Sequence, residues 1–190
     1  MGNLRIETIV DGNIEPCRSL CDELMAYQKS KAIVEPERFD GMSFEIRMKR
    51  SFEHALEKQV VVARDGDTPV GYVFSTIDVV TEQDRTAFPD WAPKKGMGFY
   101  PVWVEMPQKI GCLSNLYIRD GYRCTGLGTR LFDQTMQWLE SFPDVDLIFV
   151  YISNGNDAAL RFYLDHGFTL SHQVFGGFIT AAYKRVNRDE

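Results

Sequence analysis

The segment between residues 116 and 129 reads Leu116-Tyr117-Ile118-Arg119-Asp120-Gly121-Tyr122-Arg123-Cys124-Thr125-Gly126-Leu127-Gly128-Thr129. Its first residues predict the end of a strand, and its two glycines predict the opening of a helix. The first-turn amides of a helix have no intrahelical partner, and the helix dipole makes that end positive. Gly126 and Gly128 lack Cβ atoms, so the backbone can approach a bulky anion such as a pyrophosphate, and Arg123 adds positive charge. The segment therefore predicts a phosphate-binding loop.

Two well-known phosphate motifs do not fit this loop. A P-loop requires a lysine directly before its Ser or Thr, but Gly128 stands before Thr129. The dinucleotide fingerprint requires a third glycine or alanine, and Leu131 occupies that place. Spacing alone also leaves open a helix start that binds no ligand, because short motifs recur by chance.

The elements around the loop predict an α/β fold. A helix should run from Gly126 to about Phe142, and residues 147–152 are apolar on both faces, as in a central buried strand. A short helix over about 156–165 and a closing hairpin around Gly176-Gly177 follow. The hairpin strands are expected at 168–170 and 178–184.

The half before the loop predicts a strand, two helices, a hairpin and a further strand that leads into the loop. The expected strands lie at 4–10, 60–63, 70–77 and 110–118. An amphipathic helix is expected from Ile14 to Gln28, and a linker with Pro36 precedes a second helix capped by Ser43. Its expected inner face consists of Phe44, Met48, Phe52, Ala55 and Leu56. The order β-α-α-β-β-β-α-β-α-β-β describes a mixed sheet with helices on both faces, in one domain over residues 1–190.

Composition narrows the class of protein. The net charge of −6 argues against a nucleic-acid partner, since such proteins carry a basic footprint. No basic-then-apolar leader and no bilayer-length apolar run is present in the sequence, so we expect no membrane association. The cysteines and histidines form no metal pattern, and Cys17 and Cys21 share an apolar helical stripe that indicates buried thiols. A cytoplasmic protein without a metal is expected.

The loop resembles the acetyl-CoA-binding motif of the GNAT (Gcn5-related N-acetyltransferase) superfamily. That motif reads Arg/Gln-x-x-Gly-x-Gly/Ala after a strand ending Leu-x-Val-x-Pro, and Arg123-x-x-Gly126-x-Gly128 matches it in full. Leu116-x-Ile118 fits the strand end, whereas Asp120 stands where proline is usual, a departure expected to affect the turn more than the pocket. Residues 156–168 resemble the family's Asn-x-x-Ala-x-x-Phe-Tyr-x-x-x-Gly-Phe signature. The resemblance is specific in the last ninety residues or so and only architectural before Ile110.

The resemblance implies a GNAT fold, with a central, mixed, splayed sheet, and acetyl-CoA as the acyl donor. The positions that it assigns to the donor are Leu116, Tyr117, Ile118, Arg123, Cys124, Thr125, Gly126, Leu127, Gly128, Thr129, Asn156 and Tyr163. The pantetheine arm would pair with residues 116–118, and the pyrophosphate would lie on the amides of residues 123–129. Asn156 would touch the pantetheine or cap the short helix, and both roles remain open.

The resemblance also implies direct attack of a primary amine on the thioester. The amine would belong to a small molecule, an amino acid or a peptide, and an amide near Ile118 would stabilise the oxyanion. Tyr163 falls on the family's tyrosine position and is the candidate catalytic acid, because a phenol with a pKa of ~10 can protonate a thiolate with a pKa of ~8.5. Many relatives place a glutamate on the strand before the loop, but this strand has none. The base is therefore open among Glu82, Asp84, Glu105 and a water chain.

The stretch from about 80 to 108 is the least regular part of the chain. Such long loops are functional or disordered, and its aromatic residues argue against disorder. Trp91, Tyr100 and Trp103 either line an acceptor pocket or anchor the segment to the core. A non-catalytic CoA-binding sensor or interaction module is the alternative function, and transfer of another acyl group or transfer to oxygen also remains open. Dimers are common in the family, so a homodimer is compatible with the resemblance.

Overall fold

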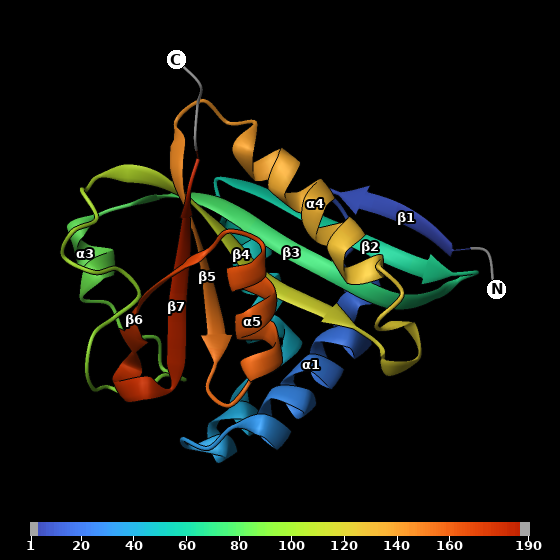
Figure 1. Ribbon diagram of the computed structural model, residues 1–190, viewed down its shortest axis with the longest axis horizontal. Helices are drawn as coiled ribbons and strands as arrows, with labels where there is room; N and C mark the ends of the chain where they lie inside the picture. Colours follow the sequence, from blue (N-terminus) through green and yellow to red (C-terminus); the bar gives the residue numbers. More distant parts are fainter. Residues whose placement is uncertain (1–3, 187–190) are drawn as a thin grey trace.

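The computed structural model describes residues 4–186, and these residues form one mixed sheet in the strand order β1-β2-β3-β4-β5-β7-β6 (Figure 1). The strands are β1 (Leu4–Ile9), β2 (Glu57–Asp65), β3 (Thr68–Val80), β4 (Gln108–Ile118), β5 (Val145–Ser153), β6 (Thr169–Val174) and β7 (Ile179–Arg185). The α-helices of the same residues are α1 (Arg18–Lys31), α2 (Arg50–His54), α3 (Glu82–Arg85), α4 (Leu127–Glu140) and α5 (Asp157–Asp165). The predicted fold class and element order are confirmed, with α3 added.

Strands β1 to β4 form an antiparallel meander, and β4 and β5 are parallel. A parallel pair needs a crossover, and α4 provides it, as the long helical pattern after the loop predicts. Strand β7 lies between β5 and β6 and is antiparallel to both. The strands of the predicted hairpin, β2 and β3, extend beyond the apolar runs that predicted them, because their polar ends continue the same ladder.

The central strands β4 and β5 pair over only part of their length. Their register runs from Lys109 opposite Val145 to Leu113 opposite Val150 and then stops. On the other side of β4 the register with β3 shifts, so that Ser114 is an extra residue without a partner. A bulge of this kind bends a strand and increases its twist. It lies where the two strands diverge, and the predicted splayed sheet is confirmed.

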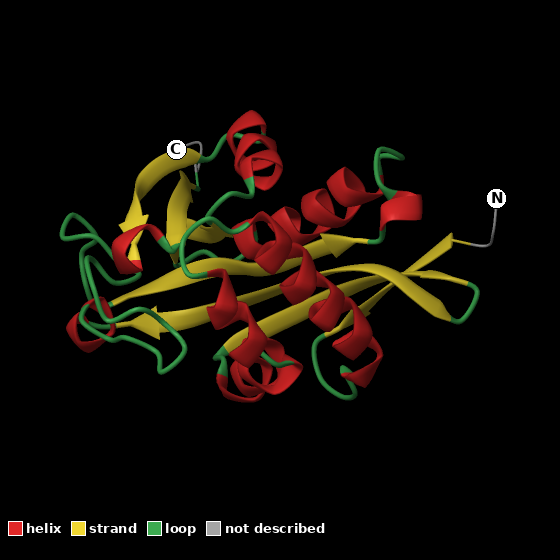
Figure 2. Cartoon of the chain, turned by 90° about the horizontal axis from the view of Figure 1, so that it is seen from below, coloured by secondary structure: helices red, strands yellow, loops and turns green. Residues whose placement is uncertain are grey.

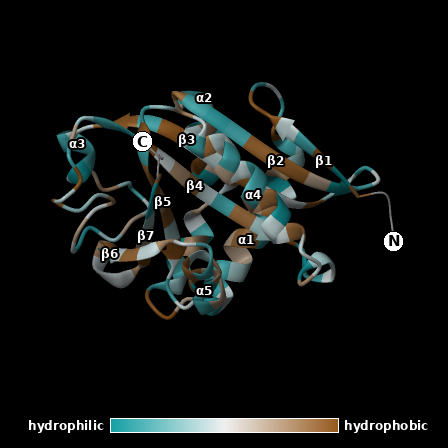
Figure 3. Cartoon of the chain, turned by 45° about the horizontal axis from the view of Figure 1, so that its top comes forward, coloured by the Kyte–Doolittle hydropathy of each residue, from teal (hydrophilic) through white to brown (hydrophobic). Residues whose placement is uncertain are grey.

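The two faces of the sheet carry different helices (Figure 2). Val60 and Val62 of β2 belong to the core that contains α1, whereas Val61 and Ala63 belong to the core that contains α4 and part of α5. This alternation follows from the two-residue period of a strand. Hydrophobic residues are concentrated in the strands between these layers, and α3 is hydrophilic (Figure 3). No helix within residues 4–186 combines the length and the apolar character needed to cross a bilayer.

The second predicted helix differs from expectation in shape. It begins after Ser43, whose carbonyl accepts the Arg47 amide at 2.9 Å, and it continues as a π-helical turn (Glu45–Lys49) before α2. Its inner face is buried at Phe44, Met48 and Phe52 and half-buried at Ala55. The prediction for Leu56 is wrong, because the helix ends at His54 and Leu56 lies in the exposed connection to β2. The predicted linker around Pro36 contains a 3-10 helix (Pro36–Gly41).

The irregular segment between β3 and β4 is ordered by its aromatic residues. The Phe99 ring lies 4.9 Å from the ring of Tyr151 on β5 and 4.9 Å from that of Phe175 after β6. Arg85 of α3 donates to the carbonyl of Val104 at 2.8 Å and also to that of Pro101. The segment is therefore packed over the face of β5 and β7.

Candidate functional site

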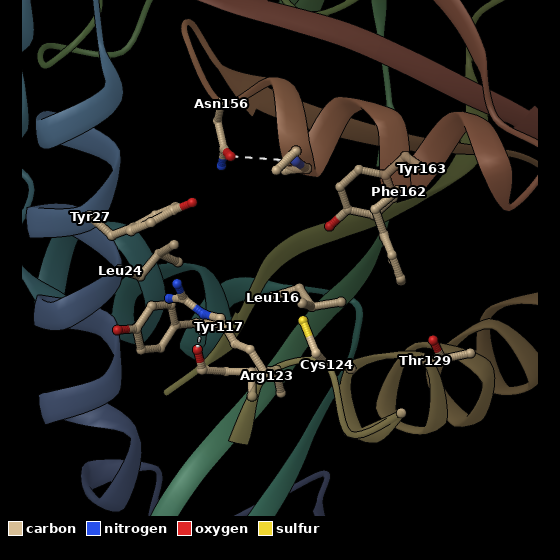
Figure 4. A pocket seen from close by; sticks show the side chains of 15 residues that line it. Leu24, Tyr27, Leu116, Tyr117, Arg123, Cys124, Thr129, Asn156, Phe162 and Tyr163 are labelled. Carbon is tan, nitrogen blue, oxygen red and sulfur yellow. Dashed lines mark hydrogen bonds between the residues drawn. The ribbon is translucent and has the colours of Figure 1, made fainter. Parts of the chain in front are cut away.

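A cavity of about 360 Å³ opens where β4 and β5 diverge, between α1, the start of α4 and α5 (Figure 4). Its walls are Leu24, Tyr27, Leu116, Tyr117, Ile118, Arg123, Cys124, Gly126, Gly128, Thr129, Asn156, Ala158, Ala159, Phe162 and Tyr163. Among the positions assigned from sequence, Thr125 and Leu127 do not line it. The Thr125 hydroxyl turns back to the carbonyl of Tyr122 at 2.7 Å, and Leu127 is buried in the core beneath α4.

The loop before α4 presents a row of unpaired amides. The first helical bond is donated by Arg130 to the Gly126 carbonyl at 3.0 Å, and the amides of residues 124 to 129 have no partner among the described residues. Cys124 (φ 58°) and Gly126 (φ 82°) both adopt the left-handed conformation, which Cys124 reaches only with backbone strain. Such a turn at a helix N-terminus forms a concave set of donors for an anion. The predicted row of free amides at the start of a helix is present, and phosphate binding by it stays a prediction.

Arg123 is fixed against the cavity wall rather than extended into solvent. Its guanidinium lies 4.7 Å from the centre of the Tyr27 ring and 5.3 Å from that of Tyr117. Its Nε donates to the Ile118 carbonyl at 2.7 Å, and its Nη1 lies 2.5 Å from a carboxylate oxygen of Asp120. Asp120 therefore contacts a residue of the pocket wall, Arg123, in addition to its place in the turn, where its main effect was expected. The Ile118 carbonyl accepts the hydrogen bond from Arg123 and keeps a second lone pair for another donor.

Two residues at α5 face the cavity: Asn156, which precedes the first turn of the helix, and Tyr163, which lies about two turns further along (Figure 4). Burial raises the pKa of Tyr163 above its ordinary value, so the phenol stays protonated and able to donate. The Asn156 side-chain oxygen accepts the Ala159 amide at 3.4 Å, which is the capping role considered from sequence. Asn156 also lines the cavity, so capping does not remove it from the site.

Two polar residues in the splay were not predicted from sequence. The side-chain amide of Asn115 and the hydroxyl of Ser153 are buried without a hydrogen-bond partner among the described residues. Both line a narrow extension of the cavity between β4 and β5. A buried polar group without a protein partner usually binds water or a ligand. The sequence held one signal for this site: Asn115 is a polar residue among the apolar residues of β4.

A second cavity of about 430 Å³ lies on the face covered by the π-helical turn and the irregular segment. It shares Ser114 and Tyr151 with the narrow extension, which in turn shares Leu116 and Tyr163 with the first cavity. The two cavities therefore lie on either side of the narrow extension at the splay.

Only some of the residues proposed from sequence for the acceptor side line this second cavity. Trp91, Tyr100 and Asp84 line it, whereas Glu82 and Glu105 do not. Asp84 accepts hydrogen bonds at 2.8 Å from both the amide and the hydroxyl of Thr81, which closes the N-terminus of α3. Trp103 also lies outside the cavity.

Trp103 anchors the irregular segment instead. Its ring lies 4.8 Å from that of Tyr183 on β7 and 6.2 Å from that of Phe149 on β5. Of the two roles considered from sequence for the aromatic residues, anchoring is therefore the one that the position of Trp103 fits.

Comparison with known proteins agrees with this geometry. A sequence profile described as the acetyltransferase (GNAT) family matches residues 23–168, which is more than half of the chain. The chain belongs to the GNAT family. A comparison with curated protein sequences gave no match.

Solved GNAT structures share the fold at low sequence identity. PaiA N-acetyltransferase from Thermoplasma acidophilum, in complex with coenzyme A, is 13% identical, with 96% of this chain and 99% of that chain covered and a TM-score of 0.63. NAA60 from Arabidopsis thaliana, in complex with a bisubstrate analogue, is 13% identical, with 97% and 99% covered and a TM-score of 0.60. The NatC complex bound to Gag peptide and CoA contains a chain that is 15% identical, with 96% and 99% covered and a TM-score of 0.57. Within residues 4–186 no cluster of His, Cys, Asp and Glu could hold a metal ion.

Proposed function

We propose that this GNAT protein is an N-acetyltransferase that transfers the acetyl group of acetyl-CoA to a primary amine of a small molecule, an amino acid or a peptide. The observation that carries the proposal is the row of unpaired amides over residues 124–129, which faces a cavity continuous with the splay of β4 and β5. The amides suit a pyrophosphate, and the splay offers main-chain and side-chain groups to an extended arm. Crystallised relatives whose structures contain coenzyme A or acetyl-CoA support this choice of donor.

The residues around the splay would carry out the transfer. Unpaired groups at Asn115 and Ser153 would hydrogen-bond the arm of the donor and hold its thioester between the two cavities. The second cavity would deliver the amine to the same point, since it reaches the splay at Ser114. Tyr163 would donate its hydroxyl proton to the departing thiolate, whose pKa is ~8.5. The cytoplasm remains our proposed location, supported by the free thiols of the chain.

Calorimetric titration with acetyl-CoA tests the donor assignment. We expect saturable one-site binding of acetyl-CoA, with no binding of NAD or ATP. Gly128→Glu should weaken binding by about 100-fold or more, because a like charge beside a phosphate costs several kcal/mol. The substitution is sterically acceptable, since a Cβ at Gly128 meets nothing closer than 3.7 Å.

Gln137→Glu is the matched control, because it adds the same charge to an exposed position of the same helix, far from the loop. It should bind acetyl-CoA as the wild type does. Equal affinity in Gly128→Glu and wild type would refute the site, and no binding at millimolar acetyl-CoA would refute the donor.

One observation favours the non-catalytic alternative: strand β4 carries no carboxylate that could act as a base. Release of free CoA thiol in the presence of an amine separates the two functions. Binding of acetyl-CoA without amine-dependent thiol release from a broad panel of amines would favour the sensor.

A further inference from the structure

The second cavity contains an arginine without a counter-charge. Arg47 lies on the π-helical turn before α2 and lines the cavity, and its Nε is buried without a hydrogen-bond partner. No acidic side chain within residues 4–186 forms an ion pair with it. Its guanidinium lies 5.2 Å from the centre of the Trp91 ring, which is a favourable contact that leaves the charge unneutralised.

The ionisable groups that surround Arg47 are neutral at physiological pH. They are the thiols of Cys21 and Cys112 and the phenol of Tyr72. Burial raises the pKa of Cys112 to about 11, and it also raises the pKa values of Cys21 and Tyr72. The same burial lowers the pKa of Arg47. Arg47 is half-buried and faces the cavity, and a buried polar atom without a protein partner usually binds water or a ligand, so the position suits a ligand that supplies the anion.

The opposite charge lies elsewhere in the same cavity. Asp78 and Asp84 line it near Tyr100, and Cys112 lies within electrostatic reach of both Asp78 and Arg47. The cavity therefore contains charges of both signs, with Asp78 opposite Ile110, at the end of β4 that pairs with β5. Each aspartate keeps one carboxylate oxygen free of the described hydrogen bonds, since Asp78 accepts the Leu56 amide through Oδ1 and Asp84 uses Oδ2.

The charge pattern favours a carboxylate over a phosphate. A guanidinium binds a carboxylate through two parallel hydrogen bonds, and one arginine balances one negative charge. A doubly charged phosphate would leave one charge unbalanced in a cavity that already contains two aspartates. The walls between the charged ends are aromatic, formed by Trp91, Phe99, Tyr100 and Tyr151. They suit a flat or apolar body.

From this arrangement we infer that the second cavity binds a molecule that carries both a carboxylate and an ammonium group, joined by an aromatic or apolar body. Arg47 binds the carboxylate, and Asp78 and Asp84 bind the ammonium group at the end of the cavity away from the splay. The recognition of the carboxylate is a binding property that can be measured separately from the reaction proposed at the splay.

The test is calorimetry on the full chain saturated with CoA, which blocks turnover. Two matched pairs of probes differ by one carboxylate: 4-(aminomethyl)benzoate against benzylamine, and L-phenylalanine against phenethylamine. The pairs cover a long and a short distance between amine and carboxylate. In at least one pair the carboxylate-bearing member should bind about 30-fold more tightly, as expected for a desolvated arginine–carboxylate pair. Equal affinity within both pairs, or no binding of any probe, would overturn the inference.

Arg47→Gln and Arg50→Gln are the matched variants. Arg47→Gln should abolish the preference for the carboxylate and leave the affinity for the simple amine unchanged. Arg50→Gln removes the same charge from an exposed position on the adjoining helix and should keep the preference. Equal losses for both members of a pair in Arg47→Gln would mean that the residue only supports the structure.

Thermal unfolding of the free protein gives an independent readout. A structural arginine would lower Tm when replaced, whereas an uncompensated cation kept for a ligand should leave Tm equal or higher in Arg47→Met. A fall in Tm together with retained carboxylate preference would overturn the assignment.

Failure of the proposed function has a different signature. It would show as absent acetyl-CoA binding, or as a carboxylate-bearing amine that binds in the cavity but releases no CoA thiol when acetyl-CoA is supplied. Neither result changes the comparison of probe affinities.

Discussion

At the scale of single residues, the hydroxyl of Tyr163 stays protonated in the cavity, and its proposed role as the acid can be tested. It faces the cavity, and burial raises its pKa above the ordinary value of about 10, so ionisation is suppressed. We expect Tyr163→Phe to lower kcat by about 100-fold or more while the Kd for acetyl-CoA stays unchanged. In the wild type, loss of this proton should not reduce kcat at any pH up to about 10, because the raised pKa keeps the phenol protonated over that range. Steady-state kinetics from pH 7 to 9.5 check both points, and a wild-type kcat in the variant would remove the role.

Cys124 offers a chemical probe of the same site. It is the exposed cysteine of the chain within residues 4–186 and lines the cavity at the phosphate loop, whereas Cys17 and Cys21 are buried with raised pKa values. We expect one fast-reacting thiol with iodoacetamide, located at Cys124 by peptide mass mapping. Saturating acetyl-CoA, which has no free thiol to consume the reagent, should slow the reaction strongly. Equal rates with and without acetyl-CoA would place the ligand elsewhere.

At the scale of elements, the turn from β5 into α5 depends on a glycine. Gly155 adopts a left-handed conformation (φ 74°), and a Cβ there would lie 2.0 Å from the carbonyl oxygen of Lys31 at the end of α1. Gly155→Ala should therefore lower the free energy of unfolding by about 2 kcal/mol or more, measured by urea denaturation. Gly41→Ala is the control, because a Cβ at Gly41 meets nothing within 4 Å and its φ is not left-handed. Equal stability of the two variants would contradict the packing of the turn on α1.

The elements also show what sequence could and could not predict. The loop of residues 123–128 and helix α4 were predictable because glycines, a cation and a 3.6-residue period act locally. The bulge at Ser114 was not, since an extra residue exists only relative to the register of the partner strand β3. Arg47 was missed for a similar reason: the widened turn at Glu45–Lys49 alters which side chains face inward, and nothing in its sequence indicates a π-helical turn. Local chemistry thus predicted the loop with free amides before α4, and tertiary packing created the second cavity.

At the scale of the whole molecule, the splayed sheet separates two tasks. The anion loop and α5 build the first cavity, whereas the π-helical turn and the irregular segment build the second. The two cavities share no lining residue; the narrow extension between them shares Leu116 and Tyr163 with the first and Ser114 and Tyr151 with the second. Damage to one side should therefore leave binding on the other side intact.

Phe99→Ala tests this independence. The Phe99 ring packs on Tyr151 and Phe175 and lines the second cavity, so its loss should lower the free energy of unfolding by about 3 kcal/mol and raise the KM for an amine acceptor. The calorimetric Kd for acetyl-CoA, measured well below the melting transition, should remain at the wild-type value. Val102→Ala, in the same segment but with 85% of its surface exposed, should change neither property. A higher Kd for acetyl-CoA in Phe99→Ala would mean that the irregular segment also shapes the first cavity. The two cavities would then not be independent.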